Sequence, residues 1–360
     1  MVAHAHFDSY KDAEVVFREV AEDPGVQLHP YLMEGKAELE VPTPPTDGIS
    51  SIRFGPDPEK ALVASWDACL RIYRCDSGEL LAQKELSLAL LDACYAGSTG
   101  YCIGGGLDRS VFAWHPEAGT VDVLGTHDHA VRNVSFLDSV GLVVSGSWDK
   151  TLRTWDLRAA SRLLTTTYLQ DRVHALSISQ PRGYIVLATA NKELLVYDFR
   201  NLQEPMVRKD SPLKYQTRCL DSMPNGEGYA LGSIEGRVGL EYFDNYQARK
   251  YAFKCHRTEA AGTTFIYMVN GIGFHPEFGT FATGGSDGVV YVWDGINKKR
   301  LWKLRQYPAP ISAVQFSPHG RYLVIGSSSL YEEGVTDPMP KDGLYIRTVE
   351  DADVQPKAKN

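Results

Sequence analysis

Short apolar segments separated by tight polar turns recur along most of this chain, and the segment from Ser145 to Asp156 shows the unit most clearly. A strand that ends in small residues leads into a turn carrying Asp149, and a second strand follows and ends at Trp155-Asp156. A Trp-Asp dipeptide at the end of such a strand is typical of one β-hairpin in a propeller blade. The pattern therefore predicts an all-β chain built from repeats of this hairpin.

The hairpin recurs when each turn acid or amide is aligned with an aromatic residue six positions further along the chain. Five turns fit this design: Asp67 with Tyr73, Asp108 with Trp114, Asp149 with Trp155, Asn191 with Tyr197, and Asp287 with Trp293. In a sixth turn Glu235 is the acid and Glu241 occupies the aromatic position, so this repeat is degenerate. The turns lie roughly 41 to 52 residues apart, near the period of about 40 to 45 residues expected for propeller blades.

A last pair of predicted strands, Tyr322 to Ser327 and Gly343 to Thr348, lacks the turn acid and is joined by a longer loop. With this pair, the sequence predicts a seven-bladed WD40 β-propeller over residues 36–351. The alternating segment Lys36 to Val41 predicts one more strand, which we expect to pair with Gly343 to Thr348 as the outer strand of blade seven. Joining the first and last strands in one blade would remove exposed sheet edges.

Three segments depart from the blade pattern. In residues 1–35, an N-terminal extension, Ser9 is placed to cap a short helix from Tyr10 to Ala21, which we expect to pack on the propeller edge. The polar, small-residue segment Thr258 to Thr264 predicts a loop that leads into blade six. Residues 352–360 predict a frayed C-terminal tail.

Composition narrows the class of protein. The chain has 360 residues, 43% of them apolar, which is ample for the core of one propeller. Six scattered cysteines without a Cys-x-x-Cys pair suit a reducing compartment and provide no zinc motif. Without an apolar run of about 18 residues or a signal-peptide pattern, we expect a soluble, intracellular protein with no membrane contact. A formal net charge of −8 argues against direct nucleic-acid binding, which needs clustered Lys and Arg.

Blade three contains four polar residues that predict an internal network. His127, Ser145, Asp149 and Trp155 can form a hydrogen-bonded chain of imidazole, hydroxyl, carboxylate and indole N–H, and a propeller uses such a tetrad to satisfy buried polar groups. The string Gly284 to Gly288 matches G-x-S-x-G, but it is predicted in a strand-turn-strand hairpin, whereas a nucleophile elbow needs a strand-turn-helix setting. We therefore expect no catalytic residue, no metal site and no cofactor.

Three short basic segments stand out on this acidic chain: Lys214 to Arg218, Glu235 to Arg237, and Lys254 to Arg257. We interpret them as recurring through blades four to six at roughly one-blade intervals, so that Arg218, Arg237 and Lys254 converge on one face of the ring. Such a cluster suits an acidic or phosphorylated peptide, because a phosphate carries about −1.5 to −2 charge and can engage several cations. The alternative is that these cations pair with nearby acids such as Glu235 and Glu241, and spacing alone leaves both interpretations open.

Particular motifs carry a resemblance to a known family. They are Asp47 to Ile52, Ser65 to Asp67, Gly105 to Asp108, Gly125 to Asp128, Ser145 to Asp156, Leu213 to Cys219, Ser233 to Val238, Tyr251 to Arg257, and Gly284 to Gly288. From about Ala37 to its end the chain resembles the budding-uninhibited-by-benzimidazole WD40 proteins of the mitotic spindle checkpoint, the Bub-three family. The N-terminal extension is not part of that family's core.

The resemblance implies a non-enzymatic adaptor of the nucleus and kinetochore that is also cytoplasmic. Proteins of this family bind GLEBS motifs of a checkpoint kinase and of its kinase-like relative, and phosphorylated Met-Glu-Leu-Thr repeats of the kinetochore scaffold. Components of the anaphase-promoting complex are further implied partners. The implied site residues are Arg218, Arg237 and Lys254 for the acidic groups, with Trp66 and Trp148 as packing partners and Tyr215 beside them.

A sister family gives the second interpretation. The WD40 mRNA-export factor of the nuclear pore also binds a GLEBS motif and shares Ser-Ile-Glu-Gly-Arg and Phe-Lys-Cys-His-Arg, but it tends to have histidines at the positions of Tyr215 and Thr217. The Tyr331 to Glu333 loop and the segment Asp342 to Arg347 also resemble the checkpoint family more. A WD40 enzyme is disfavoured by the missing nucleophile and base, and a ubiquitin-ligase substrate receptor by the absence of a recognisable adaptor segment.

Overall fold

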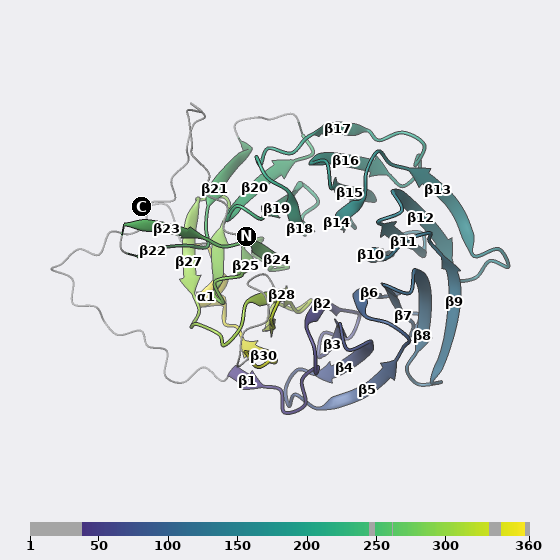
Figure 1. Ribbon diagram of the computed structural model, residues 1–360, viewed down its shortest axis with the longest axis horizontal. Coiled ribbons are helices and arrows are strands. Elements are labelled where there is room, and N and C mark those ends of the chain that lie inside the picture. The colour runs from purple at the N-terminus through teal and green to yellow at the C-terminus, as the bar shows by residue number, and fades with distance from the viewer. Residues whose placement is uncertain (1–37, 245–248, 261, 331–339, 357–360) are drawn as a thin grey trace.

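The computed structural model describes residues 38–244, 249–260, 262–330 and 340–356. In these ranges the chain folds into seven four-stranded antiparallel sheets, which stand as blades around a central axis (Figure 1). The prediction of a seven-bladed all-β propeller is confirmed. The predicted N-terminal helix and the Tyr331 to Glu333 loop lie outside the described residues.

Blades one to three follow the chain in order from the inner strand to the outer strand. Blade one contains β2 (Ile49–Phe54), β3 (Lys60–Ser65), β4 (Cys69–Arg74) and β5 (Leu80–Glu85). Blade two contains β6 (Leu90–Tyr95), β7 (Cys102–Gly106), β8 (Ser110–His115) and β9 (Thr120–Thr126). Blade three contains β10 (Val131–Leu137), β11 (Leu142–Ser147), β12 (Thr151–Asp156) and β13 (Leu163–Tyr168).

The remaining blades continue in the same way round the ring. Blade four contains β14 (Val173–Ser179), β15 (Tyr184–Thr189), β16 (Glu193–Asp198) and β17 (Val207–Asp210). Blade five contains β18 (Thr217–Ser222), β19 (Gly228–Ser233), β20 (Arg237–Tyr242) and β21 (Tyr251–Lys254). Blade six contains β24 (Val269–Phe274), β25 (Phe281–Gly285), β26 (Val290–Asp294) and β27 (Lys299–Lys303), and blade seven contains β28 (Ile311–Phe316), β29 (Tyr322–Ser327), β30 (Gly343–Thr348) and β1 (Glu38–Glu40).

The turn between the second and third strands of a blade has one recurring backbone conformation. The residue after the turn acid or amide adopts a positive φ in blades one to six. These residues are Ala68, Arg109, Lys150, Lys192, Gly236 and Gly288, with φ between 62° and 70°. In blade three the Asp149 carboxylate accepts the N–H of Thr151 at 2.9 Å, which offsets the strain of the left-handed residue between them.

Apolar side chains of adjacent blades pack against each other. Between blades four and five, for example, Val186 and Leu194 belong to one buried cluster with Leu220, Tyr229 and Leu231. A single blade would leave such faces in water, and at about 25 cal/mol per Å² of buried apolar surface the stacking stabilises the whole ring.

The two ends of the blade array meet in blade seven. Strand β1 pairs with β30, with Glu38 opposite Arg347 and Glu40 opposite Tyr345, which confirms the strand predicted from Lys36 to Val41 (Figure 1). The Glu38 carboxylate also accepts hydrogen bonds from Arg305 Nε at 2.7 Å and from Tyr307 Oη at 2.6 Å. These contacts fasten the first strand to blades six and seven.

Two sequence-based predictions about the irregular segments are wrong. The segment predicted as the loop Thr258 to Thr264 lies in a hairpin formed by β22 (Arg257–Ala260) and β23 (Thr263–Ile266), because its Thr-rich halves can pair antiparallel. The predicted frayed tail instead begins with α1 (Asp351–Val354), where buried Val354 accepts a hydrogen bond from Thr280 Oγ1 through its carbonyl at 2.8 Å. None of the helices in the described part of the chain is long and apolar enough to cross a membrane.

Candidate peptide-binding face

The antiparallel order of a blade decides which strand ends share an edge. In blade five, Thr217 at the start of β18 pairs with Ser233 at the end of β19, and Arg237 at the start of β20 pairs with Lys254 at the end of β21. We call the face formed by these ends the upper face; it carries the turns with the aligned acids. The three basic segments therefore meet this face within blade five and at its junction with blade six. The interpretation that placed them in neighbouring blades is wrong.

Arg237 and Lys254 are direct cross-strand neighbours on the outer half of blade five. Directly opposite residues have Cβ atoms about 4.5 to 5.5 Å apart, and two like charges in such a pair destabilise a sheet. The Arg237 side chain is 29% exposed to solvent, and Lys254 is exposed. Arg237 Nε also lies 3.8 Å from Glu235 Oε2. The pair thus places two cations side by side at the rim of blade five.

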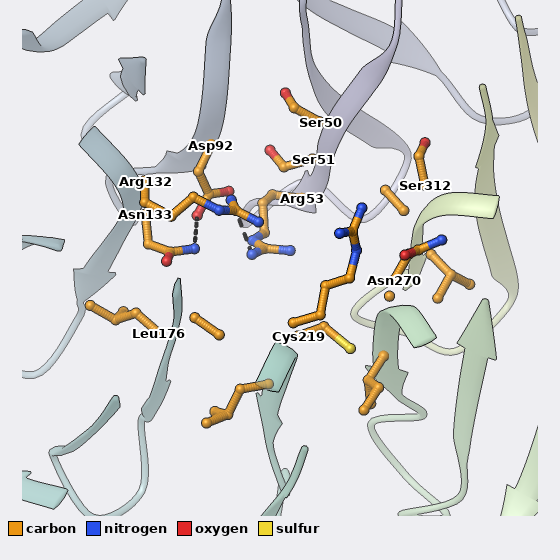
Figure 2. Close-up of a pocket in the computed structure, with 17 residues that line it drawn as sticks. Ser50, Ser51, Arg53, Asp92, Arg132, Asn133, Leu176, Cys219, Asn270 and Ser312 are labelled. Carbon is orange, nitrogen blue, oxygen red and sulfur yellow. Dashed lines mark hydrogen bonds and ion pairs between the residues drawn. The ribbon is translucent and has the colours of Figure 1, made fainter. Parts of the chain in front are cut away.

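Arg218 lies apart from this pair, on the inner strand β18, where it lines a cavity of about 60 Å³ in the central channel. Figure 2 shows Arg53, Asp92 and Arg132 around the same cavity. Arg53 pairs with Asp92 at 3.5 Å. Burial, together with the charges of Arg218 and Arg53, lowers the pKa of Arg132, whereas Asp92 acts in the opposite sense. Three arginines and one aspartate thus line the same cavity, which gives this part of the central channel more positive than negative side chains.

The three aromatic residues expected in the site lie on loops of three different blades. Trp66 is 46% exposed in the β3–β4 turn, where its backbone N–H donates to Gly48 O at 2.8 Å. Trp148 occupies the equivalent turn of blade three and is half-buried. Tyr215 is half-buried in the loop before β18, with Lys214 Nζ 5.7 Å from its ring centre. The structure thus distributes these aromatic groups along the upper face instead of gathering them in one pocket.

The four polar residues of blade three form a continuous chain of hydrogen bonds. Trp155 Nε1 donates to Ser145 Oγ at 2.8 Å, Ser145 Oγ lies 2.8 Å from His127 Nε2, and His127 Nδ1 lies 2.8 Å from Asp149 Oδ2. Burial opposes ionisation of Asp149, but hydrogen bonds from His127 and Thr151 hold its pKa well below the usual range. Because each of these four side chains is hydrogen-bonded to the next, the network rigidifies the turn that carries Trp148.

Two related networks were not predicted. In blade six, His256 contacts Asp287 Oδ1 at 2.8 Å and Thr283 Oγ1 at 2.9 Å, and Trp293 Nε1 donates to Thr283 Oγ1 at 2.9 Å. The histidine and its acid are 31 positions apart here but 22 in blade three. The hairpin of β22 and β23 is inserted between the two residues, so the spacing of blade three does not reveal this network. Thr283, which lies four positions before Asp287 as Ser145 does before Asp149, could have revealed it.

Blade one holds its turn acid with an arginine instead of a histidine. Arg71 donates to Ser65 Oγ at 3.0 Å and pairs with Asp67 Oδ2 at 2.8 Å. Although burial opposes ionisation, hydrogen bonds from Arg71 and Ser65 lower the pKa of Asp67 to about 2. The turn that carries Trp66 is therefore supported by an ion pair, whereas the Trp148 turn is supported by a histidine.

Within the described ranges, no group of three or more His, Cys, Asp or Glu side chains is arranged to hold a metal ion. All six cysteines are free, and burial raises the pKa of the Cys219 thiol to about 12, so the thiolate nucleophile is not populated at neutral pH. In the Gly284 to Gly288 string, the Asp287 carboxylate is occupied by His256.

The fold and its repeats define a WD40-repeat β-propeller protein. A family model described as WD domain, G-beta repeat, matches residues 38–74, 119–156, 252–294 and 298–329. A solved structure of U3-55K has a TM-score of 0.74, covering 87% of this chain and 98% of that structure at 17% identity, and so shares the fold.

Similarity to curated proteins is more specific. The chain is 46% identical to mitotic checkpoint protein BUB3.1 of Arabidopsis thaliana, over 90% of this chain and 96% of the relative. It is 37% identical to mitotic checkpoint protein bub3 of Dictyostelium discoideum, over 86% and 94%. A poly(A)+ RNA export protein of Schizosaccharomyces pombe is 33% identical, over 90% and 94%. The chain belongs to the Bub3 family of mitotic checkpoint proteins, which confirms the resemblance seen in its motifs.

Proposed function

We propose that this chain is a non-enzymatic adaptor of the mitotic spindle checkpoint that binds two acidic partner segments on its upper face. One is a GLEBS motif of a checkpoint kinase or its kinase-like relative, and the other is a phosphorylated Met-Glu-Leu-Thr repeat of the kinetochore scaffold. By holding both, the protein recruits the kinase to kinetochores, from nuclear and cytoplasmic pools. Components of the anaphase-promoting complex are further partners in this proposal.

The observation that carries the proposal is the direct pairing of Arg237 with Lys254 across β20 and β21. Two like charges at this position cost sheet stability, and a bound dianion relieves that cost. Hydrogen bonds between ionised partners contribute about 1.5 to 3 kcal/mol each, and a phosphate oxygen set can engage both cations. A phosphothreonine therefore gains more from this pair than an unmodified threonine does.

We assign the GLEBS segment to the centre of the upper face. Arg218, Arg132 and Arg53 line one cavity together with Asp92, which pairs with Arg53, so the channel favours an incoming acidic side chain. Trp66, half exposed in its supported turn, gives the apolar part of an extended segment a surface to pack on. The channel site lies at the inner part of the upper face and the Arg237–Lys254 pair at its outer part, so both segments can bind at the same time.

The test measures binding of fluorescently labelled Met-Glu-Leu-Thr peptides, phosphorylated and unphosphorylated, to the full chain carrying a GLEBS peptide. Phosphorylation is expected to tighten binding, and Arg237→Ala or Lys254→Ala is expected to weaken it by about tenfold or more, with thermal unfolding nearly unchanged. Lys299→Ala is a matched control, because it removes a cation from the opposite edge of blade six, at the start of β27.

Each contrary result has a distinct meaning. If Arg237→Ala lost thermal stability to the same extent as it lost phosphopeptide binding, the result would support the alternative in which Arg237 serves only a structural ion pair with Glu235. Tight GLEBS binding with no preference for phosphate would favour the mRNA-export function, in agreement with the 33% identity to the export protein. Binding of neither peptide would contradict the adaptor proposal.

A further inference from the structure

Among its described residues, blade five lacks the internal network that occupies the turn acid in blades three and six. Leu231 occupies the position of Ser145 in blade three, because each pairs with the residue four positions after the turn acid of its blade. Glu241 likewise occupies the position of Trp155, six residues after the turn acid. The turn acid is Glu235, one methylene longer than the aspartates in those blades. The chain therefore keeps a carboxylate in this turn after losing the network that a carboxylate serves elsewhere.

Glu235 lies at the edge of the proposed phosphate site. Its side chain is only 13% exposed, and its Oε2 atom lies 3.8 Å from Arg237 Nε. Its Oε1 atom is buried with no hydrogen-bond partner among the described residues. Its backbone carbonyl accepts a hydrogen bond from Arg257 Nη2 at 3.0 Å, which holds the turn against the start of β22. The carboxylate is thus held near Arg237 with unused accepting capacity.

We propose that Glu235 is a resident competitor for Arg237, and that it weakens phosphopeptide binding so that the complex stays reversible. This inference rests on the proposed function, because the competing ligand is the phosphate of the scaffold peptide. A phosphate that binds Arg237 must compete with this carboxylate for the guanidinium. The site is therefore built for regulated release and not for the highest affinity.

The charge of the ligand sets the size of the effect. A fixed negative charge beside the site repels a dianionic phosphate about twice as strongly as a singly charged carboxylate at the same distance. Removing that charge should therefore help a phosphopeptide more than a peptide in which aspartate replaces the phosphothreonine. The difference should shrink at high salt, because the groups are partly exposed and screened.

Glu235→Gln is the decisive variant. The amide keeps the size of the side chain and an oxygen that can accept from Arg237, so it removes the charge and preserves the support. We expect the phosphorylated peptide to bind about threefold to tenfold tighter, mainly through slower dissociation, and the aspartate peptide less than about threefold tighter. Raising the salt from about 50 mM to about 300 mM should reduce the gain.

Asp171→Asn provides the matched control. Asp171 follows β13 on the same face, where it lies 3.8 Å from Lys150, so this variant removes one negative charge away from blade five. It should change phosphopeptide affinity less than about twofold. Thermal unfolding of both variants checks that each remains folded.

The outcomes separate the inference from the proposed function. If the unmodified protein binds the phosphopeptide but Glu235→Gln binds it equally or more weakly, Glu235 only positions Arg237 and the competitor role is overturned. The same conclusion follows if Asp171→Asn produces the same gain, since the effect would then reflect net charge. If the unmodified protein shows no preference for phosphate, the proposed function fails, and the competitor role fails with it.

Discussion

Blades three and five are built on the same four-stranded plan but use their polar residues in opposite ways. In blade three, Asp149, His127 and Ser145 are joined through buried hydrogen bonds, and Trp155 completes the chain. In blade five the equivalent positions cannot form that chain, and Arg237 and Lys254 face each other at the rim. The first arrangement stabilises the fold, whereas the second accumulates charge at the surface.

The difference shows how a repeat protein gains a binding site. The ring is held by contacts between neighbouring blades, so one blade can lose its internal network while its neighbours keep the shape. Blade five also replaces the buried aromatic residue by Glu241, which is held by Lys209 Nζ at 2.5 Å and Lys250 Nζ at 3.8 Å. Ion pairs thus take over part of the stabilising role of the missing network.

The largest expected effect is the loss of the carboxylate in blade three. Asp149→Ala removes the acceptor of His127 Nδ1, of the Thr151 N–H and hydroxyl, and of the Asp128 N–H. Leaving the donors of buried His127 and Thr151 without this acceptor should lower the free energy of unfolding by about 3 to 4 kcal/mol, measured by urea denaturation. Glu235→Ala in blade five should cost less than about 1 kcal/mol. Equal losses would contradict the contrast between the two blades.

A smaller effect is expected from the ion pairs of blade five. Glu241 is 5% exposed, and Glu241→Gln removes its charge while keeping an oxygen that can accept from Lys209. We expect a loss of about 1 to 2 kcal/mol in the free energy of unfolding, with phosphopeptide affinity unchanged within about twofold. A loss of affinity larger than the Lys299→Ala control would place Glu241 in the binding site.

A third expected difference is in the pH dependence of stability of blades one and five. The pKa of Asp67 is lowered to about 2, so its contribution is complete above its ordinary pKa of 3.8 and is lost as the pH falls toward 2. Burial raises the pKa of Asp221 to about 6, although Arg53 opposes the shift, so its effect is the reverse and stability falls as the pH rises from 3.8 through 6.

Urea denaturation between about pH 2 and pH 7 tests this difference. Asp67→Asn should flatten the acid limb, and Asp221→Asn should remove the fall between about pH 4 and pH 6, each by about 2 kcal/mol. Identical pH profiles for the two variants would mean that the two carboxyl groups have the same environment.

The sequence by itself determined the architecture. The acid or amide with an aromatic residue six positions on, as in Asp149 and Trp155, recurs at nearly constant spacing, and each such hairpin must stack on neighbours to bury its faces. The same local reasoning identified the strand from Lys36 to Val41 and the tetrad residues, because their signals lie within one repeat. It also singled out Arg218, Arg237 and Lys254 as unusual basic residues.

Only the tertiary structure decided where those residues lie. Arg237 and Lys254 are 17 positions apart, less than half a blade, and the antiparallel return of the chain brings them together at one edge of blade five. The blade-six network was hidden for a related reason, since His256 reaches Asp287 across an inserted hairpin. Docking of Val354 likewise depends on a distant partner, Thr280. Spacing along a chain gives the period of a repeat, but contacts depend on the direction in which each strand runs and on what is inserted between strands.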